Sequence, residues 1–329
     1  WLWMTLEECA AGWGWGVWSP NDRAWYDVVQ HLGRAAEAVE EQPVATIPLK
    51  IHQIWLGSRE IPEKCLHMME TWKLHHPTWD YQLWTDADVE AVLGKGRLAA
   101  AFARAESPAE RSDILRLELI LQHGGLYVDV DFECLQPFDG LHRRFSFYTG
   151  VSNVGAFELN NGLFAACPAH PLTQFLCDKV ARPWPEWGKQ DVDVNEAVAF
   201  QLEQSGMLGV SLADTKGHAA FLATTGPGFF TRAVMRGLAG YTNSEAAPIA
   251  VLPPEVFYPL PNSLRDLSLE ERRARASTAT FAIHHWFKTW DSAELDTVRA
   301  EGSDPSKCPL DDSELLESDK GMVNGPDEV

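Results

Sequence analysis

Two carboxylates, Asp129 and Asp131, stand two residues apart where an apolar run of strand character, residues 125–128, ends. Side chains at positions i and i+2 of a strand project from the same face, so the two carboxylates are expected to converge. At a separation of about 6 Å they would repel each other by about 3 kcal/mol at an effective dielectric near 20. A divalent cation between them removes that cost, and hard carboxylate oxygens favour Mg²⁺ or Mn²⁺. The alternative is that both aspartates only form a turn after the strand.

The segment before this pair carries the signals of a long helix. The residues Ser-Pro-Ala-Glu at 107–110 predict a capped N-terminus with proline in the first turn, and Gly124 is typical of a C-terminal cap. Asp113 and Arg116 lie three residues apart on this otherwise apolar helix. Because buried charges are costly unless paired, these two side chains either pair with each other or point at a polar ligand shared with the aspartates.

The surrounding chain alternates between strand and helix patterns. Residues 50–55 and 79–84 predict strands, and residues 62–74 predict a helix between them. This alternation favours an α/β fold with a mainly parallel sheet and helices on both faces. Ligands of such folds gather at the carboxyl ends of the strands, where Trp55 and Asp131 both lie.

The most distinctive stretches are Arg-Ser-Asp-Ile-Leu-Arg at 111–116 and Gly-Gly-Leu-Tyr-Val-Asp-Val-Asp at 124–131. Further motifs follow a fixed order along the chain, at 51–57, 160–162, 168–171, 225–227 and 284–290. Together they resemble the core of glycosyltransferase family 32, the sugar transferases with a D-x-D sugar-binding region. Members of that family include yeast Golgi mannosyltransferases, mannosyl-inositolphosphoceramide synthases and bacterial capsule glycosyltransferases. The resemblance spans roughly residues 47 to 290.

The resemblance implies a GT-A glycosyltransferase fold, with a Rossmann-like, mainly parallel central sheet and helices on both faces. A nucleotide-diphosphate sugar would be the donor. By position, Trp55 would stack on its base, and Asp113 and Arg116 would hold the ribose and the sugar hydroxyls. Asn161 would line the sugar pocket, and Trp290 would close over the diphosphate or the sugar.

The resemblance also implies a site for Mn²⁺ or Mg²⁺. Asp131 would ligate the metal directly, and Asp129 would contact the metal, the ribose or the sugar. A further ligand would come from His284 or His285. Because successive residues of a strand face opposite ways, only one of these two histidines is expected to serve, and we expect His285.

The implied activity is a metal-dependent, retaining transfer of a hexose from GDP-mannose or a uridine-linked sugar to a glycan, sphingolipid or protein acceptor. Asp113, Arg116 and Asp129 would stand at the reacting centre. No residue is an evident nucleophile, which favours a same-face transfer over a double displacement. Two alternatives remain. One is a catalytically inactive carbohydrate- or lipid-binding relative. The other is a D-x-D phosphohydrolase of the haloacid dehalogenase type, which has Thr or Val where this chain has Glu133.

Composition limits the remaining possibilities. The 329 residues carry a formal net charge of −20, which argues against binding the phosphate backbone of nucleic acids. We expect a Trp-rich N-terminal extension at 1–46, packed on the domain or on a partner, a catalytic domain at 47–300 and an acidic, disordered tail at 301–329. The chain begins with Trp1, so membrane contact through an upstream anchor is compatible with it. The resemblance favours the Golgi or secretory lumen, and a cytoplasmic location stays open.

Overall fold

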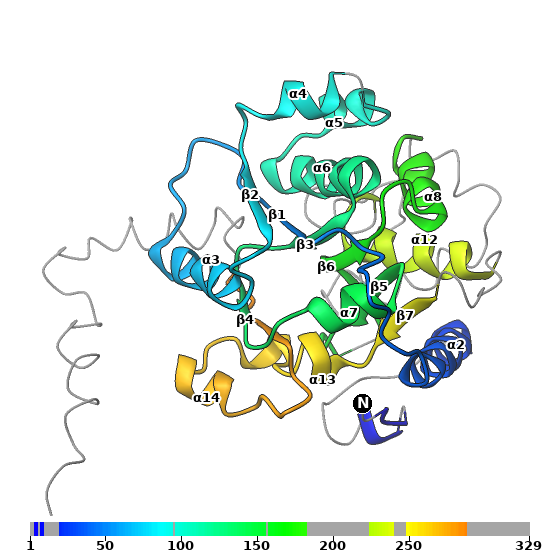
Figure 1. Ribbon diagram of the computed structural model, residues 1–329. Helices are drawn as coiled ribbons and strands as arrows, with labels where there is room; N and C mark the ends of the chain where they lie inside the picture. Colours follow the sequence, from blue (N-terminus) through cyan, green and yellow to red (C-terminus); the bar gives the residue numbers. More distant parts are fainter. Residues whose placement is uncertain are drawn as a thin grey trace, which may run out of the picture. The chain divides into compact units, whose positions relative to one another are not determined.

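The computed structural model describes residues 3–5, 7–9, 20–94, 96–155, 157–182, 224–239 and 248–287. Within them, a six-stranded sheet has the order β2-β1-β3-β6-β5-β7 (Figure 1). Its strands are β1 (Lys50–Ile54), β2 (Asp80–Trp84), β3 (Gly125–Val128), β5 (Phe147–Val151), β6 (Leu159–Ala166) and β7 (Ile249–Leu252). Only β6, among these strands, runs antiparallel to its neighbours, so the sheet is mainly parallel, as predicted.

Alternate residues of the strands face two separate hydrophobic cores. Tyr127, Phe164 and Val251 face the side that contains residues of α6 (Pro108–His123), α8 (Pro171–Val180) and α12 (Pro227–Ala239). Val128, Leu163 and Leu252 face the side that contains residues of α3 (Glu63–His75), α7 (Asp139–Arg144) and α13 (Pro254–Phe257). The prediction of helices on both faces is therefore confirmed.

Helix α6 begins and ends where its sequence signals predicted. The Ser107 hydroxyl accepts a hydrogen bond from the backbone N–H of Glu110 at 3.1 Å. The Glu110 carboxylate reaches the N–H of Glu106, at 2.8 Å, rather than that of Ser107. At the other end Gly124 has a φ of 62°, and a Cβ there would lie 2.6 Å from the Pro168 ring, so both its backbone angle and its surroundings require glycine.

The predicted first strands and the helix between them agree with β1, α3 and β2 to within about one residue. A short helix, α4 (Val89–Leu93), follows β2 and is preceded by a turn that the Asp88 carboxylate closes by accepting hydrogen bonds from Thr85. Helix α5 (Ala99–Arg104) then leads into α6.

A second, two-stranded sheet was not predicted. Strand β4 (Phe132–Cys134) pairs antiparallel with β8 (Ala282–His284), with Phe132 opposite His284. Between β7 and β8 the chain forms α13, a 3₁₀ turn η1 (Asn262–Leu264) and α14 (Leu269–Arg273). This ladder brings a segment some 150 residues further along the chain beside the D-x-D residues.

The N-terminal part packs on the same domain where the structure describes it. Helix α2 (Pro20–Glu37) contacts β7. Trp3 is 8% exposed and meets the Tyr26 ring edge-on at 6.0 Å. The proposed domain limits stay a prediction, because residues 240–247 and 288–329, including the expected tail, lie outside the described residues.

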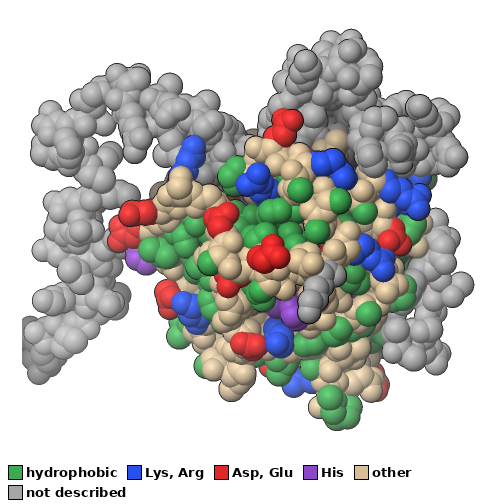
Figure 2. Space-filling view, turned by 90° about the horizontal axis from the view of Figure 1, so that it is seen from above, with side chains coloured by type: hydrophobic (Ala, Val, Ile, Leu, Met, Phe, Trp, Pro, Cys, Tyr) green, Lys and Arg blue, Asp and Glu red, His purple; other side chains and the backbone are tan. Residues whose placement is uncertain are grey.

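The surface seen from above carries mixed charge. Figure 2 shows acidic and basic side chains interspersed around apolar ones on this face. The net charge of −20 is therefore not gathered into one acidic patch on the part of this face that is drawn in colour. Among the described helices, none combines the length and the apolar character that crossing a bilayer requires.

Candidate active site

Asp129 and Asp131 lie in the short connection between β3 and β4, at the carboxyl end of β3. The backbone N–H of Asp129 donates to the Gly162 carbonyl at 2.8 Å, which fixes the start of this turn against β6. Ligand atoms from Asp129, Asp131 and His284 all lie within 4.8 Å of one another. The two aspartates therefore converge, and an imidazole joins them.

Asp131 is held by two donors from the C-terminal segment. Its Oδ1 lies 3.2 Å from Nε2 of His284, and its Oδ2 accepts a hydrogen bond from the Phe287 N–H at 3.0 Å. Burial alone would raise the pKa of Asp131, but His284 and the Phe287 N–H outweigh it and hold that pKa below its usual range. The His284 ring stacks on Phe132 at 4.3 Å and an angle of 2°, which fixes its orientation.

Asp129 has different partners. Its Oδ1 accepts a hydrogen bond from the Tyr127 hydroxyl at 2.6 Å and lies 3.4 Å from Nη1 of Arg116. Burial raises the pKa of Asp129, and Arg116 opposes that rise. The mutual repulsion of the two aspartates is thus reduced on each side by a separate donor, Arg116 for Asp129 and His284 for Asp131.

Asp113 and Arg116 form a buried network on the α6 side of the sheet. Nη2 of Arg116 lies 3.0 Å from Oδ1 of Asp113. Asn161 and Thr225 also donate to the Asp113 carboxylate, at 2.8 and 3.2 Å. Burial nevertheless raises the pKa of Asp113 to about 7. The predicted pairing of Arg116 with Asp113 is confirmed, and Arg116 also reaches Asp129, while a polar ligand shared with the aspartates stays a prediction.

His285 faces away from the aspartates, which corrects our expectation that it would be the metal ligand. Its Nε2 lies 3.0 Å from Oε2 of Glu133, and its Nδ1 lies 3.5 Å from Nη1 of Arg272. Burial would raise the pKa of Glu133, but hydrogen bonds from His285 and Arg273 hold it below the usual range. The reason for the correction is the direction of the two rings: the His284 ring stacks on Phe132, its partner in the ladder, and reaches Asp131 with Nε2, whereas the His285 ring pairs with Glu133.

Trp55 follows β1 directly and is half-buried. Its Nε1 donates to the Arg59 carbonyl at 2.7 Å, and its ring packs on a small cluster of Cys65, Met69 and Val130. Since Val130 stands between the two aspartates, this ring lies close to the D-x-D turn. The other predicted tryptophan, Trp290, lies outside the described residues.

The motif at 160–162 lies inside β6, and it therefore is not the hairpin turn that Asn-Gly often forms. Asn161 faces Asp113 from this strand. The sequence analysis assigned no role to three further residues. Tyr127 and Thr225 contact Asp129 and Asp113, and Glu133 contacts His285. Tyr127 could have been found by strand alternation, because it precedes Asp129 by two residues and therefore faces the same side.

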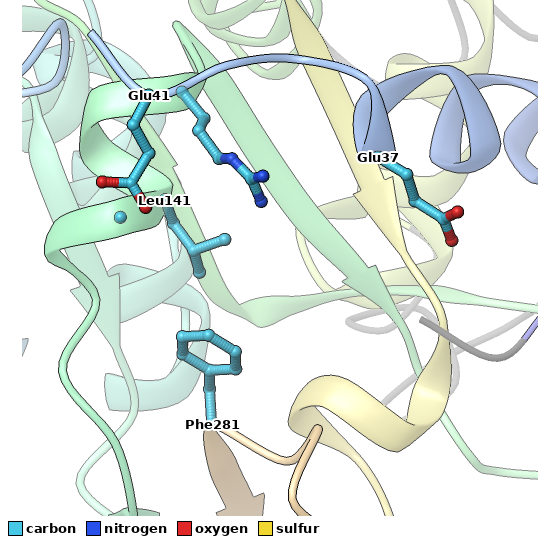
Figure 3. A pocket seen from close by; sticks show the side chains of 6 residues that line it. Glu37, Glu41, Leu141 and Phe281 are labelled. Atoms are coloured by element: carbon cyan, nitrogen blue, oxygen red, sulfur yellow. The ribbon is translucent and has the colours of Figure 1, made fainter.

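A separate cavity of about 330 Å³ lies between α2, α7 and the residue before β8, lined by Glu37, Glu41, Gly140, Leu141, Arg144 and Phe281. Figure 3 shows Leu141 and Phe281 pointing toward each other, with Glu41 beside Leu141. The Glu41 carboxylate pairs with Arg143 at 3.0 Å. This cavity shares no residue with the group of Asp129, Asp131 and His284, and we do not include it in the site.

Comparison with known proteins gives matches to the region around this site. Residues 62–148 match the family described as the glycosyltransferase sugar-binding region containing a DXD motif. Inositol phosphoceramide mannosyltransferase 1 of Schizosaccharomyces pombe is 28% identical over 131 residues, 38% of this chain and 40% of that protein. Mannosyl phosphorylinositol ceramide synthase CSH1 of Saccharomyces cerevisiae is 29% identical over 134 residues, 40% of this chain and 35% of that protein.

A longer match is Subversion of eukaryotic traffic protein A of Legionella pneumophila, 25% identical over 238 residues, 62% of this chain and 35% of that protein. Among solved structures, the PaToxG glycosyltransferase aligns with a TM-score of 0.45 and 17% identity, over 67% of this chain and 79% of that one. The ligand-free glycosyltransferase domain of the YGT toxin aligns with a TM-score of 0.43 and 11% identity, over 86% and 92%.

The chain spans about two fifths or less of the length of these curated relatives. The matched family region contains α6 and the D-x-D turn, and with them Asp113, Arg116, Asp129 and Asp131. As the motifs predicted, residues 62–148 match the sugar-binding region of the DXD glycosyltransferases, and the chain is similar over about two fifths of its length to yeast mannosyltransferases and mannosyl phosphorylinositol ceramide synthases.

Proposed function

We propose that this chain is a metal-dependent, retaining glycosyltransferase of the GT-A type that moves a hexose from a nucleotide-diphosphate sugar to a glycan, lipid or protein acceptor. One observation carries the proposal. Three candidate metal ligands, from Asp129, Asp131 and His284, meet beside a buried polar network that Arg116 connects to Asp129. A group of this kind at the carboxyl edge of a mainly parallel sheet fits binding of a charged ligand.

The residues fit a divalent cation. Two carboxylates and one imidazole form the donor set, and this mixture of oxygen and nitrogen favours Mn²⁺ over Mg²⁺, which prefers oxygen ligands throughout. His284 is fixed by Phe132, and Asp131 by the Phe287 N–H, so both are oriented in advance. When bound, the cation would neutralise the diphosphate that leaves as the glycosidic bond breaks.

The side chains around the cation site would bind the other parts of the donor. Arg116 is held by Asp113 and by the Asn161 carbonyl at 2.8 Å, so its charge stays beside Asp129 without rearrangement. Asp113, with Asn161 and Thr225, offers carboxylate, amide and hydroxyl groups of the kind that recognise sugar hydroxyls. In this proposal Trp55, whose ring packs beside Val130 of the D-x-D turn, stacks on the nucleotide base.

For the donor sugar and the acceptor, the proposal rests on the names of the relatives. The yeast proteins to which the chain is similar are named inositol phosphoceramide mannosyltransferase and mannosyl phosphorylinositol ceramide synthase. We therefore take GDP-mannose as the first donor to test and an inositol-containing sphingolipid as the first acceptor. A Golgi or secretory location belongs to the same proposal.

The test is hydrolysis of nucleotide sugars by the purified chain, with and without Mn²⁺. We expect Mn²⁺-dependent release of free sugar and nucleoside diphosphate. Asp131→Asn should abolish it, while Asp178→Asn makes the same chemical change at an exposed ion pair with Arg97 and should leave it intact. Turnover that ignores Mn²⁺, or survives in Asp131→Asn, would contradict the proposal. No turnover of any donor would favour the inactive relative.

A further inference from the structure

A second histidine–carboxylate pair lies directly behind the proposed metal site. Nε2 of His285 lies 3.0 Å from Oε2 of Glu133, and both side chains are buried, with exposed fractions of 0% and 5%. Since Arg272 can only donate to Nδ1, the ring proton of His285 lies on Nε2 and is donated to Glu133. Both ring nitrogens are therefore engaged, and neither Glu133 nor His285 has an assigned role in binding the donor.

Two arginines from α14 hold this pair from the other side. Nη2 of Arg273 lies 2.7 Å from Oε1 of Glu133. Arg272 donates to the His285 carbonyl at 3.1 Å and is itself fixed by the carbonyls of Arg265 and Leu267. The pair thus connects α14, β4 and the residue after β8.

The next two residues join this pair to the metal site. Trp286 has a φ of 57°, a left-handed conformation that is unfavourable for a bulky side chain. This turn brings the N–H of Phe287 back to Oδ2 of Asp131 at 3.0 Å. Surrounding contacts must hold such a conformation in place, and they include the hydrogen bond from Trp286 Nε1 to the Leu260 carbonyl at 2.9 Å.

The ladder that carries His284 is short. Strands β4 and β8 pair over only three residues each, and a two-stranded ladder of that length is marginal on its own. The His285 N–H adds one bond, to the Asp131 carbonyl at 3.0 Å. Beyond that, the side-chain pair of Glu133 and His285 is the contact that fixes β4 to the segment after His284.

We propose that Glu133 and His285 are positioning residues: their buried hydrogen bond, braced by Arg272 and Arg273, holds the 285–287 turn so that His284 and Asp131 present their ligand atoms together. The inference rests on the proposed metal site. Loss of the pair releases the turn at Trp286, and with it the Phe287 N–H that orients Asp131.

Binding of Mn²⁺ to the full chain tests this directly, measured by electron paramagnetic resonance of the free ion. Glu133→Ala is expected to weaken Mn²⁺ binding by about 10- to 100-fold, the range found when the outer partners of metal ligands are removed. Glu133→Gln should restore most of it, because its amide oxygen can still accept from His285, while its NH₂ group then faces Arg273 and leaves a loss like that of removing Arg273. Nucleotide affinity measured in EDTA should stay unchanged in both variants.

The matched control is Glu118→Ala. Glu118 is also buried, at 2% exposure, and accepts hydrogen bonds from the Leu98 N–H and from Gln122. Its loss should lower folding stability without changing Mn²⁺ affinity. If Glu133→Ala does not fold, Arg273→Ala replaces it, because that side chain is 54% exposed. We expect it to weaken Mn²⁺ binding by about threefold, the size of a half-exposed ion pair.

If Glu133→Ala folds and binds Mn²⁺ with the affinity of the unaltered chain, the proposal is wrong. If Glu133→Ala does not fold, an unaltered Mn²⁺ affinity in Arg273→Ala overturns the proposal in the same way. If the unaltered chain binds no more Mn²⁺ than Asp131→Asn, the proposed metal site is wrong instead. The positioning role is then decided by the ¹⁵N imidazole resonances of His284. The His284 resonances should shift in Glu133→Ala and not in Glu118→Ala. Unshifted His284 resonances in Glu133→Ala overturn the positioning role.

Discussion

The Asp129 carboxylate occupies the space into which a side chain at Gly162 would project. A Cβ at Gly162 would lie 2.8 Å from Oδ2 of Asp129, closer than real Cβ contacts occur, and 3.2 Å from the Phe132 ring. The two residues are also joined by the hydrogen bond from the Asp129 N–H to the Gly162 carbonyl. Glycine at this position therefore allows the carboxylate to lie against β6.

We expect Gly162→Ala to displace the Asp129 carboxylate. A displacement of about 1 Å at a reacting group costs about 100-fold in rate, so kcat/KM for donor hydrolysis should fall by about that factor. The stability cost should be about 1–3 kcal/mol, as for other overpacked sites. The control is Gly140→Ala, whose Cβ meets only the flexible end of Glu41. Unchanged kcat/KM in Gly162→Ala would show that Asp129 does not act in turnover.

Asp131→Asn should destabilise the fold even though it removes a repulsion between two carboxylates. The pKa of Asp131 lies below its usual range, since the partners of the charged form outweigh the cost of burial, so the folded state favours that charge. An asparagine can accept from either His284 or the Phe287 N–H, but its amide then faces the other donor. We expect a loss of about 1–2 kcal/mol in urea unfolding at pH 7. A stability equal to that of Asp178→Asn would contradict this.

Trp55→Ala should weaken nucleotide binding. Stacking of a base on an aromatic ring contributes about 1–3 kcal/mol, which corresponds to roughly 5- to 150-fold in the dissociation constant. Calorimetric titration with nucleoside diphosphates measures it. Trp79→Phe is the control, because Trp79 packs between His76 and His142 in the core on the α3 side of the sheet, away from Trp55. If only stability changes in Trp55→Ala, that ring belongs to the core and not to the nucleotide site.

Buried histidines should destabilise this fold in acid. Burial lowers the pKa of His52 to about 4 and that of His142 to about 3. An unfolded histidine has a pKa of about 6.5, so below that pH the unfolded state binds protons that the folded state refuses. The contribution of His52 to the free energy of unfolding should therefore fall by about 3 kcal/mol between about pH 6.5 and pH 4. Asp113 opposes this fall, because its raised pKa of about 7 lets the folded state bind a proton in the same range.

Urea unfolding at several pH values in this window measures the effect. His52→Gln keeps a donor for the Gly124 carbonyl, which His52 Nε2 meets at 2.9 Å, and cannot titrate. Its stability should fall less steeply with acid. Ring resonances of His52 that titrate near pH 6.5 would contradict the expectation.

Local signals predicted much of this fold. The cap at Ser107, the glycine at 124 and the alternation of β3 each depend on near neighbours in the chain, and the structure agrees with all three. The meeting of Asp113 and Arg116 with Asp129 could also be anticipated, because α6 leads directly into β3.

The choice between His284 and His285 could not be predicted in this way. It depends on the pairing of β8 with β4 across 150 residues, and a shift of one position exchanges the two rings. The same holds for Asn161, whose dipeptide with Gly162 locally favours a turn. Burial between β3 and β5 makes it part of a strand instead.

Because β6 runs antiparallel to β3, the start of β6 lies at the same edge of the sheet as the ends of β1 and β3. Chain leaving β1 and β3 delivers Trp55 and Asp129 to this rim, whereas chain entering β6 delivers Asn161 and Gly162 to the same place. Insertions in the connection between β5 and β6 would therefore shift Asn161 and Gly162, while insertions after Ala166 would emerge at the opposite edge of the sheet, far from Asp129 and Asp131.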